Sequence, residues 1–190
     1  MSGTTPIKRH QALLSFSRDH HFGLLLVWKI KQGLDNAVSP DRISDYVLYF
    51  FEQDLQQHFR EEEELLFPKL PADNALRQRA EREHAIIYGL VAQLRFDTTN
   101  EALLWRFANT LKDHIRFEER ELFVAIQQQL GDAAAAIAAA HDKKRSAQAD
   151  KEWQDRFWEI KKKIVNHGYQ CTNQNKRHPK RKGRCIGCHR

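Results

Sequence analysis

Hydrophobic residues recur every three or four positions along most of the first 130 residues, which is the spacing of one face of an α-helix. Four such segments can be marked, over about 7–34, 40–66, 74–96 and 98–130. The links between them are short, so consecutive helices are expected to lie side by side and to run in opposite directions. The sequence therefore predicts an all-α fold, with an antiparallel up-down-up-down four-helix bundle over residues 7–130.

Residues that start or stop helices stand at the ends of these segments. Ser39 followed by Pro40 is typical of an N-cap with proline at the first helical position. Thr98, with Glu101 three residues later, predicts a capping box for the fourth helix, and Gly131 predicts its end. Capping chemistry thus supports the boundaries that the periodicity indicates.

A weaker pattern follows the fourth segment. We expect an Ala-rich helix over 133–140 and then a further amphipathic helix. The second of these would carry Trp153, Phe157, Trp158 and Ile160. Residues 131–167 are therefore expected to form a C-terminal helical extension that packs on the bundle, and residues 168–190 a basic tail that contains cysteine and histidine.

Composition agrees with a helical protein and bears on its location. The 190 residues include 8 Gly and 5 Pro, which is few for a chain rich in loops or strands. No stretch approaches 18 uncharged apolar residues, so we expect no membrane span and no membrane partner. The first residues lack the pattern of a signal peptide. The expected location is the cytoplasm.

The net charge of +6 belongs to the end of the chain. Residues 160–190 hold ten of the 31 Lys and Arg residues and none of the 25 Asp and Glu residues, so residues 1–159 are net acidic. A basic block of this kind is either a solvated extension or a surface that contacts nucleic acid or an acidic partner.

Each of the four predicted apolar stripes contains a histidine, and two of them add a glutamate one turn later. These residues are His20, His58 with Glu62, His84, and His114 with Glu118. On the first helix, His21 is the rival of His20. We favour His20 because apolar residues flank it on one face: Phe16, Leu24 and Val27.

Burial of these side chains needs a chemical explanation. An ionised carboxylate in an apolar core costs several kcal/mol or more unless it is paired, protonated or bound to a metal. Two glutamates beside four imidazoles would satisfy one another around a pair of divalent cations. Iron fits this mixture of ligands better than magnesium or calcium, whereas zinc and manganese are alternatives.

A plainer interpretation exists for each residue taken alone. A single histidine on an apolar helix face is more often a hydrogen-bonded core residue than a ligand. The acidic run at 61–64 alone would be a solvated face. Four histidines on four stripes, two of them with the same glutamate offset, favour the metal site.

Short motifs carry a family resemblance. The pieces are Asp19-His20, His58-Phe59-x2-Glu62-Glu63-x3-Phe67-Pro68, Glu83-His84 and His114-x3-Glu118-Glu119. Together they resemble the hemerythrin-like, or HHE, family over about residues 10–130. The resemblance implies an antiparallel four-helix bundle with an oxo- or hydroxo-bridged pair of non-haem iron ions. The four histidines would be terminal ligands, and Glu62 and Glu118 would be bridging carboxylates.

The sequence departs from the oxygen-carrying members of that family at two positions. Those members have a second histidine one turn after the third-helix ligand, where this chain has Tyr88. They also have an aspartate five residues after the fourth-helix histidine, where this chain has Glu118 at four. Both differences resemble the branch that includes the repair-of-iron-centres proteins and related sensors. Tyr88 would ligate iron as a phenolate, hydrogen-bond an iron-bound water, or line the pocket.

The tail carries a second set of soft ligands. Cys171, His178, Cys185 and Cys188 have spacings compatible with a small zinc site. The Cys185-x2-Cys188-His189 run also matches the c-type haem attachment pattern, but that chemistry requires export and no export signal is visible. The third alternative is an unstructured tail with a redox-sensitive Cys185/Cys188 pair.

These features together predict a non-haem di-iron protein that binds or senses O2 or NO, or handles iron, with O2, NO or peroxide as its small ligand. The alternative is a repair or iron-donation factor for iron–sulfur centres, or a peroxidase-like enzyme at the same site. A third possibility is a regulatory module whose basic tail contacts nucleic acid or an acidic partner.

Overall fold

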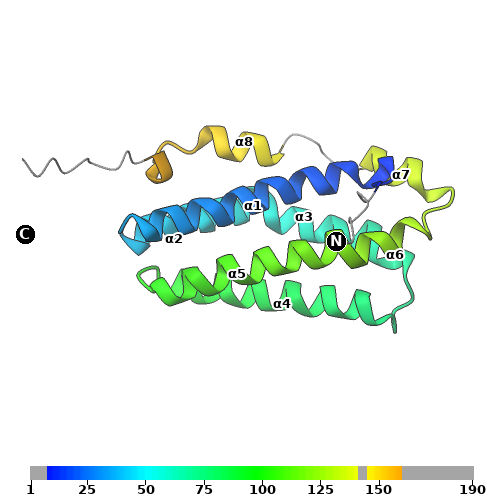
Figure 1. Ribbon diagram of the computed structural model, residues 1–190, viewed down its shortest axis with the longest axis horizontal. Helices are drawn as coiled ribbons and strands as arrows, with labels where there is room; N and C mark the ends of the chain where they lie inside the picture. The colour runs from blue at the N-terminus through cyan, green and yellow to red at the C-terminus, as the bar shows by residue number, and fades with distance from the viewer. Residues whose placement is uncertain (1–7, 141–144, 160–190) are drawn as a thin grey trace, which may run out of the picture.

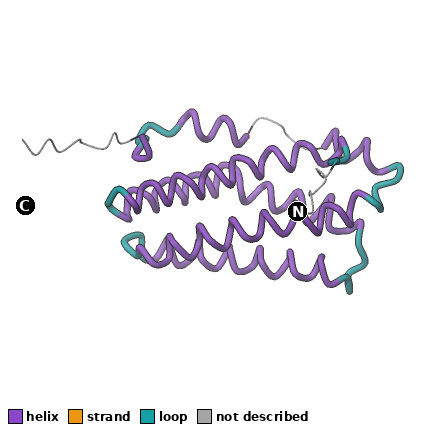
Figure 2. Tube along the Cα trace, viewed as in Figure 1, coloured by secondary structure: helices purple, strands orange, loops and turns teal. Residues whose placement is uncertain are grey.

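The computed structural model describes residues 8–140 and 145–159, and these residues form helices, turns and loops without a strand (Figures 1 and 2). The predicted all-α class is confirmed. Among these residues, no helix is both long enough and apolar enough to cross a membrane. The predicted basic tail and its proposed zinc ligands, Cys171, His178, Cys185 and Cys188, lie outside the described residues.

The helical elements follow the four predicted segments, but the second and fourth segments are each divided by π-helical turns. In chain order, the elements are η1 (Gln11–Leu13), α1 (Leu14–Asp35), α2 (Pro40–Phe50), the π turn η2 (Phe51–Leu55), α3 (Gln56–Glu61), the π turn η3 (Glu62–Leu66), η4 (Phe67–Lys69), α4 (Ala75–Phe96), α5 (Glu101–Phe117), the π turn η5 (Glu118–Leu122), α6 (Phe123–Gln127), α7 (Ala133–Ala140), α8 (Arg145–Glu152) and η6 (Phe157–Glu159). The predicted Ala-rich helix is confirmed as α7.

The long helices lie side by side along the long axis of the molecule (Figure 1). α1 packs on α5 and α2, and α4 packs on α5 and α2. The buried apolar residues form two clusters, a larger one that includes Ile30, Phe50 and Leu94, and a smaller one that includes Phe16 and Phe123. Along each long helical run, the polar residues that the sequence singled out lie where residues of one cluster give way to residues of the other.

The start of α5 differs from the prediction. Asn100, not Thr98, is the N-cap, and its side chain accepts a hydrogen bond from the Leu103 backbone N–H at 3.1 Å. The Thr98 carbonyl instead accepts a hydrogen bond from the Ser44 hydroxyl at 2.7 Å. The side chain of Asp97 holds the preceding turn through bonds to the following residues, so the helix starts two residues later than a Thr98 cap requires. The predicted capping box is therefore wrong.

The expected helix from Trp153 onward is also wrong in the part of the chain that is described, because α8 ends at Glu152. Asp155 binds Arg42 of α2 through two bonds of 2.7 and 2.9 Å, and its carbonyl accepts a hydrogen bond from the Trp153 indole. These contacts take the chain out of helical geometry. Helical geometry resumes in η6, and Phe157 of this element is buried against the bundle.

A buried lysine joins α8 to the bundle. Lys29 of α1 is 2% exposed and donates hydrogen bonds to the Tyr46 hydroxyl at 2.9 Å and to the Asp150 carboxylate of α8. Tyr46 also donates to Asp150, at 2.6 Å, and the Lys29 ammonium lies 3.9 Å from the centre of the Trp158 ring. The C-terminal segment thus supplies the counter-charge for a cation that would otherwise be buried alone.

Gly33 is a sensitive test of this packing. A Cβ at Gly33 would lie 2.8 Å from Ile43 and 2.9 Å from Phe157, so Gly33→Ala is expected to lower the free energy of unfolding by about 1–3 kcal/mol. Gly89 of α4 is the matched control, because nothing lies within 4 Å of a Cβ there and alanine favours the helix. Urea unfolding of the full chain should show Gly33→Ala destabilised and Gly89→Ala unchanged or stabilised. Equal effects would contradict the close approach of η6 to α1.

Candidate metal centre

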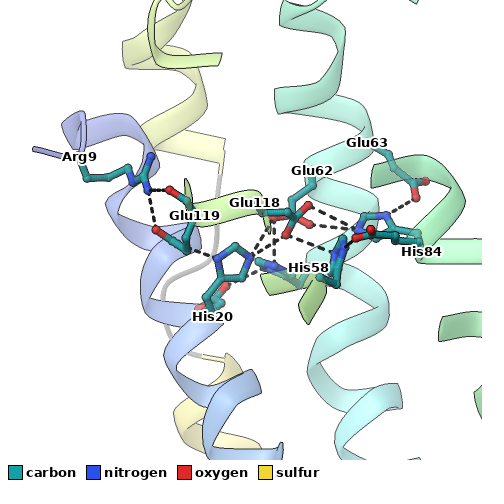
Figure 3. Close-up of polar contacts among 11 residues, drawn as sticks. Arg9, His20, His58, Glu62, Glu63, His84, Glu118 and Glu119 are labelled. Atoms are coloured by element: carbon teal, nitrogen blue, oxygen red, sulfur yellow. Dashed lines mark hydrogen bonds and ion pairs between the residues drawn. The ribbon is translucent and has the colours of Figure 1, made fainter. Parts of the chain in front are cut away.

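Six buried polar side chains meet in the layer between the two apolar clusters (Figure 3). They are His20 on α1, His58 on α3, Glu62 at the start of η3, His84 on α4, His114 on α5 and Glu118 at the start of η5. None of them is more than 3% exposed. These are the six residues that the sequence singled out, and the structure brings all of them together.

On α1 the buried histidine is His20, at 3% exposure, whereas His21 is exposed. One reason given for preferring His20 was wrong, because Leu24 is 38% exposed and does not share its face. Gly23 takes the inward position instead. A Cβ on Gly23 would lie 2.8 Å from the Ile115 side chain, so α1 approaches α5 closely beside His20.

Each imidazole directs its Nε2 atom toward the two glutamates. His58 and His84 have Glu62 as the nearer carboxylate, and His20 and His114 have Glu118. The shortest Nε2-to-oxygen distances are 3.1 Å for His20, 3.2 Å for His58, 3.5 Å for His84 and 3.3 Å for His114. The four rings and two carboxylates therefore enclose one small polar volume.

The inward atoms contact one another as ion pairs but form no hydrogen bonds among the described residues. All four Nε2 atoms and all four oxygens of Glu62 and Glu118 are buried and lack a hydrogen bond within the described part of the chain. Leaving such atoms unsatisfied is costly and rare in native proteins. Metal–ligand bonds of about 2.1 Å put neighbouring ligand atoms roughly 3.0 Å apart at right angles and roughly 3.4 Å apart in a tetrahedron. The shortest spacings here, 3.1–3.5 Å, are close to these values, so the donor set fits divalent metal ions.

The donors divide into two overlapping groups whose ligand atoms lie within 4.8 Å of one another. One group contains Glu62, His84, His114 and Glu118, and the other contains His20, His58 and Glu62. Glu62 belongs to both, and Glu118 also lies 3.1 Å from the Nε2 of His20. The two groups are therefore candidate metal positions that have Glu62 in common.

Four further carboxylates, here called the outer carboxylates, lie beside the outward nitrogens of the imidazoles: three form hydrogen bonds, and Asp19 makes a longer ion-pair contact with His58. The Nδ1-to-oxygen distances are 3.5 Å from His58 to Asp19, 2.7 Å from His84 to Glu63, 2.9 Å from His114 to Glu83 and 2.7 Å from His20 to Glu119. A carboxylate on Nδ1 fixes the ring orientation and makes Nε2 the nitrogen that faces a metal.

The outer carboxylates form a closed cycle. Each stands directly beside one of the six central residues in the sequence, yet each holds the histidine of the next helical run. One residue along a helix turns the side chain by about 100°, which aims it at the neighbouring helix instead of at the centre. These acids stand within the family motifs, but their role was not predicted from the sequence. The feature of the sequence that indicates them is an acidic residue directly beside a candidate ligand in each of the four helical runs.

Without metal, the pKa values in the centre favour protonated His58 and His84 and an ionised Glu62. Burial lowers the pKa of His58, but Glu62 and Asp19 raise it more, to about 10. Burial also lowers the pKa of His84, and Glu62 and Glu63 raise it to about 9. Burial raises the pKa of Glu62, but the surrounding histidines lower it further, well below its ordinary value. At neutral pH a metal ion must therefore displace protons from these imidazoles.

The two glutamates occupy equivalent places in the backbone. Glu62 begins the π turn η3 and Glu118 begins the π turn η5, and each follows a central histidine by four residues. π turns are rare and are frequent at functional sites. The two segments with the His-x3-Glu spacing thus share a backbone distortion as well.

Tyr88 lies one turn after His84 and is half-buried. Its ring packs edge-on against Phe51 at 5.4 Å and Phe59 at 5.9 Å between ring centres. Phe59 in turn stacks on the His84 ring at 4.0 Å. Burial, together with the charge of Glu63, raises the pKa of the Tyr88 hydroxyl. These contacts place Tyr88 in the wall behind His84.

Comparison with known proteins agrees with this geometry. No curated protein and no solved structure matches the chain. The family model for the hemerythrin HHE cation-binding domain matches residues 19–126, a range that holds all six central residues and all four outer carboxylates. The resemblance drawn from the sequence motifs is therefore confirmed, and the chain belongs to the hemerythrin family of HHE cation-binding domains.

Proposed function

We propose that this protein holds two non-haem iron ions inside an antiparallel four-helix bundle. His20 and His58 would bind one ion and His84 and His114 the other, with Glu62 and Glu118 as bridging carboxylates. The observation that supports this most strongly is the set of buried Nε2 and carboxylate oxygen atoms that face one another at 3.1–3.5 Å and form no hydrogen bond in the described residues. Mixed imidazole and carboxylate ligands suit iron better than magnesium or calcium, which prefer oxygen alone.

We further propose that the centre binds or senses O2 or NO. A reduced iron pair held by these residues would supply the electrons and the binding position for a diatomic gas. Aromatic side chains cover two of the imidazoles: Phe59 stacks on His84, and Phe123 stacks on His20 with ring centres 5.1 Å apart. Buried rings against two imidazoles limit the access of water to the site.

The test of this function uses the reduced protein without oxygen. Addition of O2 or NO is expected to change the visible absorption spectrum, and removal of the gas is expected to reverse the change. Sustained turnover of peroxide would instead favour a peroxidase-like enzyme, and restoration of a damaged iron–sulfur enzyme would favour iron donation. No spectral response to either gas would contradict the proposal.

The outer carboxylates predict a separate result for metal affinity. Glu83 accepts a hydrogen bond from Arg79 at 2.8 Å and holds the His114 Nδ1. Loss of its charge in Glu83→Gln is expected to weaken metal binding roughly 10- to 100-fold, because the His114 ring loses its anchor. Glu81→Gln is the matched control: Glu81 accepts a similar 2.8 Å bond from Arg77 on the same helix but contacts none of the four histidines in the described structure.

Metal titration under matched conditions measures both affinities. Glu81→Gln is expected to bind metal as tightly as the unchanged protein. A Glu83→Gln variant with undiminished affinity would show that the outer contact to His114 has no part in holding a metal.

A further inference from the structure

An open cavity of about 600 Å³ lies where the start of α1 meets the end of α6. Its lining includes Lys8, Arg9, His10, Leu14, Gln127 and Gln128. The lining combines basic and amide side chains and contains no acid. The volume is within the range of sites that bind small molecules. This cavity is distinct from the six central residues, and the proposed function does not use it.

Arg9 connects the cavity to the metal centre (Figure 3). One guanidinium nitrogen, Nη2, donates hydrogen bonds to the carbonyl and to the carboxylate of Glu119, both at 2.6 Å. Glu119 in turn holds the Nδ1 of His20 at 2.7 Å. A contact chain of three residues thus runs from the cavity wall to a candidate metal ligand.

The same guanidinium has an unused donor. The Arg9 side chain is 9% exposed, and its Nη1 is buried without a hydrogen-bond partner in the described residues. A guanidinium carries five N–H donors, and an unsatisfied buried donor is costly. The cavity lining adds the positive charge of Lys8 and, among the described residues, no carboxylate. Glu119 already pairs with the charge of Arg9, but Arg9 and Lys8 both line the cavity, so an anion there would lie beside two cationic side chains.

We propose that this cavity binds a small organic anion, a carboxylate or phosphate on a polar body. Arg9 and Lys8 would contact the charged group, and the amides of Gln127 and Gln128 would hydrogen-bond the body. The regulatory consequence, unlike the binding itself, rests on the proposed metal function. An anion that contacts Arg9 weakens the contact between Arg9 and Glu119, and thereby the contact between Glu119 and His20. Anion binding and metal binding are therefore coupled, and the coupling is reciprocal.

The binding test uses the full metal-free chain and calorimetry at constant ionic strength. Inorganic phosphate, succinate and glycerol 3-phosphate are the probes, and glycerol is the neutral control. These arms separate phosphate from carboxylate, and a bare anion from one on a hydroxylated body. At least one anion is expected to bind saturably at one site, and glycerol is expected not to bind.

A charge placed in the cavity provides the matched variant. Gln128→Glu is expected to weaken anion binding roughly tenfold or more by like-charge repulsion, without a change at Arg9. Gln93→Glu makes the same substitution on the exposed face of α4 and is expected to leave binding unchanged. The proposal is overturned if no probe saturates, or if Gln128→Glu binds as tightly as the unchanged chain.

The coupling has its own readout, also in the metal-free protein. The ring nitrogen resonances of His20 are expected to shift when the anion saturates the cavity, and to shift less in Gln128→Glu at the same anion concentration. Saturable binding with unmoved His20 resonances would overturn the coupling. Because neither measurement requires iron, a protein that failed to bind iron would refute the proposed function and leave the anion site standing.

Discussion

Replacement of His20 by alanine is expected to reduce the iron content from about two ions per chain to about one or fewer, whereas His21→Ala is expected to keep both. His20 is buried, and its Nε2 lies 3.4 Å from Glu62 and 3.1 Å from Glu118. The imidazole of its sequence neighbour is exposed. Removal of the His20 imidazole deletes one metal ligand and also leaves Glu62 and Glu118 with less positive charge nearby.

The two variants control for each other because they make the same substitution at adjacent positions of one helix. Elemental analysis after reconstitution with iron measures the content, and circular dichroism shows that each variant is folded. Iron loss from His21→Ala, or full iron retention by folded His20→Ala, would contradict the geometry described here.

The dependence of stability on pH is expected to change sign when metal is removed. In the metal-free protein, the pKa values of His58 and His84 are raised to about 10 and about 9 from an ordinary 6.5. Their protonated forms therefore stabilise the fold fully below pH 6.5, and this contribution is lost as the pH rises toward 9 and 10. The lowered pKa of Glu62 acts oppositely: its contribution is present above pH 4.5 and is lost as the pH falls further.

The metal-free protein should thus be most stable between about pH 4.5 and 6.5 and lose at least about 1 kcal/mol toward pH 9. The metal-loaded protein should gain stability from pH 5 to pH 8, because protons compete with metal for the imidazoles. Thermal unfolding of both forms across this range measures the two slopes. If stability changed with pH in the same direction in both forms between pH 6.5 and 8, the interpretation that metal displaces protons from the imidazoles would be refuted.

Much of the centre could be predicted from periodicity because its residues lie on apolar stripes. His84, for example, stands between the buried Ala80 and Ile87 at helical spacing, so its burial follows from the pattern alone. The same logic located His114 and Glu118. On α1 it was less secure, because Gly23 replaces an apolar side chain at the inward position and exposed Leu24 resembles a core residue in sequence.

Other features depend on tertiary contacts that one helix does not encode. Asp19 and Glu83 look like solvated acids in sequence, and only the neighbouring helix shows that each holds a histidine. The π turns at Glu62 and Glu118 were not predicted, because a single π turn inside a helix leaves the apolar spacing of the helix on either side intact. The early end of α8 depends on the pairing of Asp155 with Arg42, more than a hundred residues away in sequence.

The central claim is that the four buried imidazoles and two buried glutamates hold a pair of metal ions. Its most direct test is an anaerobic titration of the metal-free protein with ferrous iron, followed by measurement of the bound iron and of the protons released. The account predicts about two irons per chain, bound with release of protons. A protein that binds no iron, or that binds it without releasing protons at neutral pH, would contradict the account.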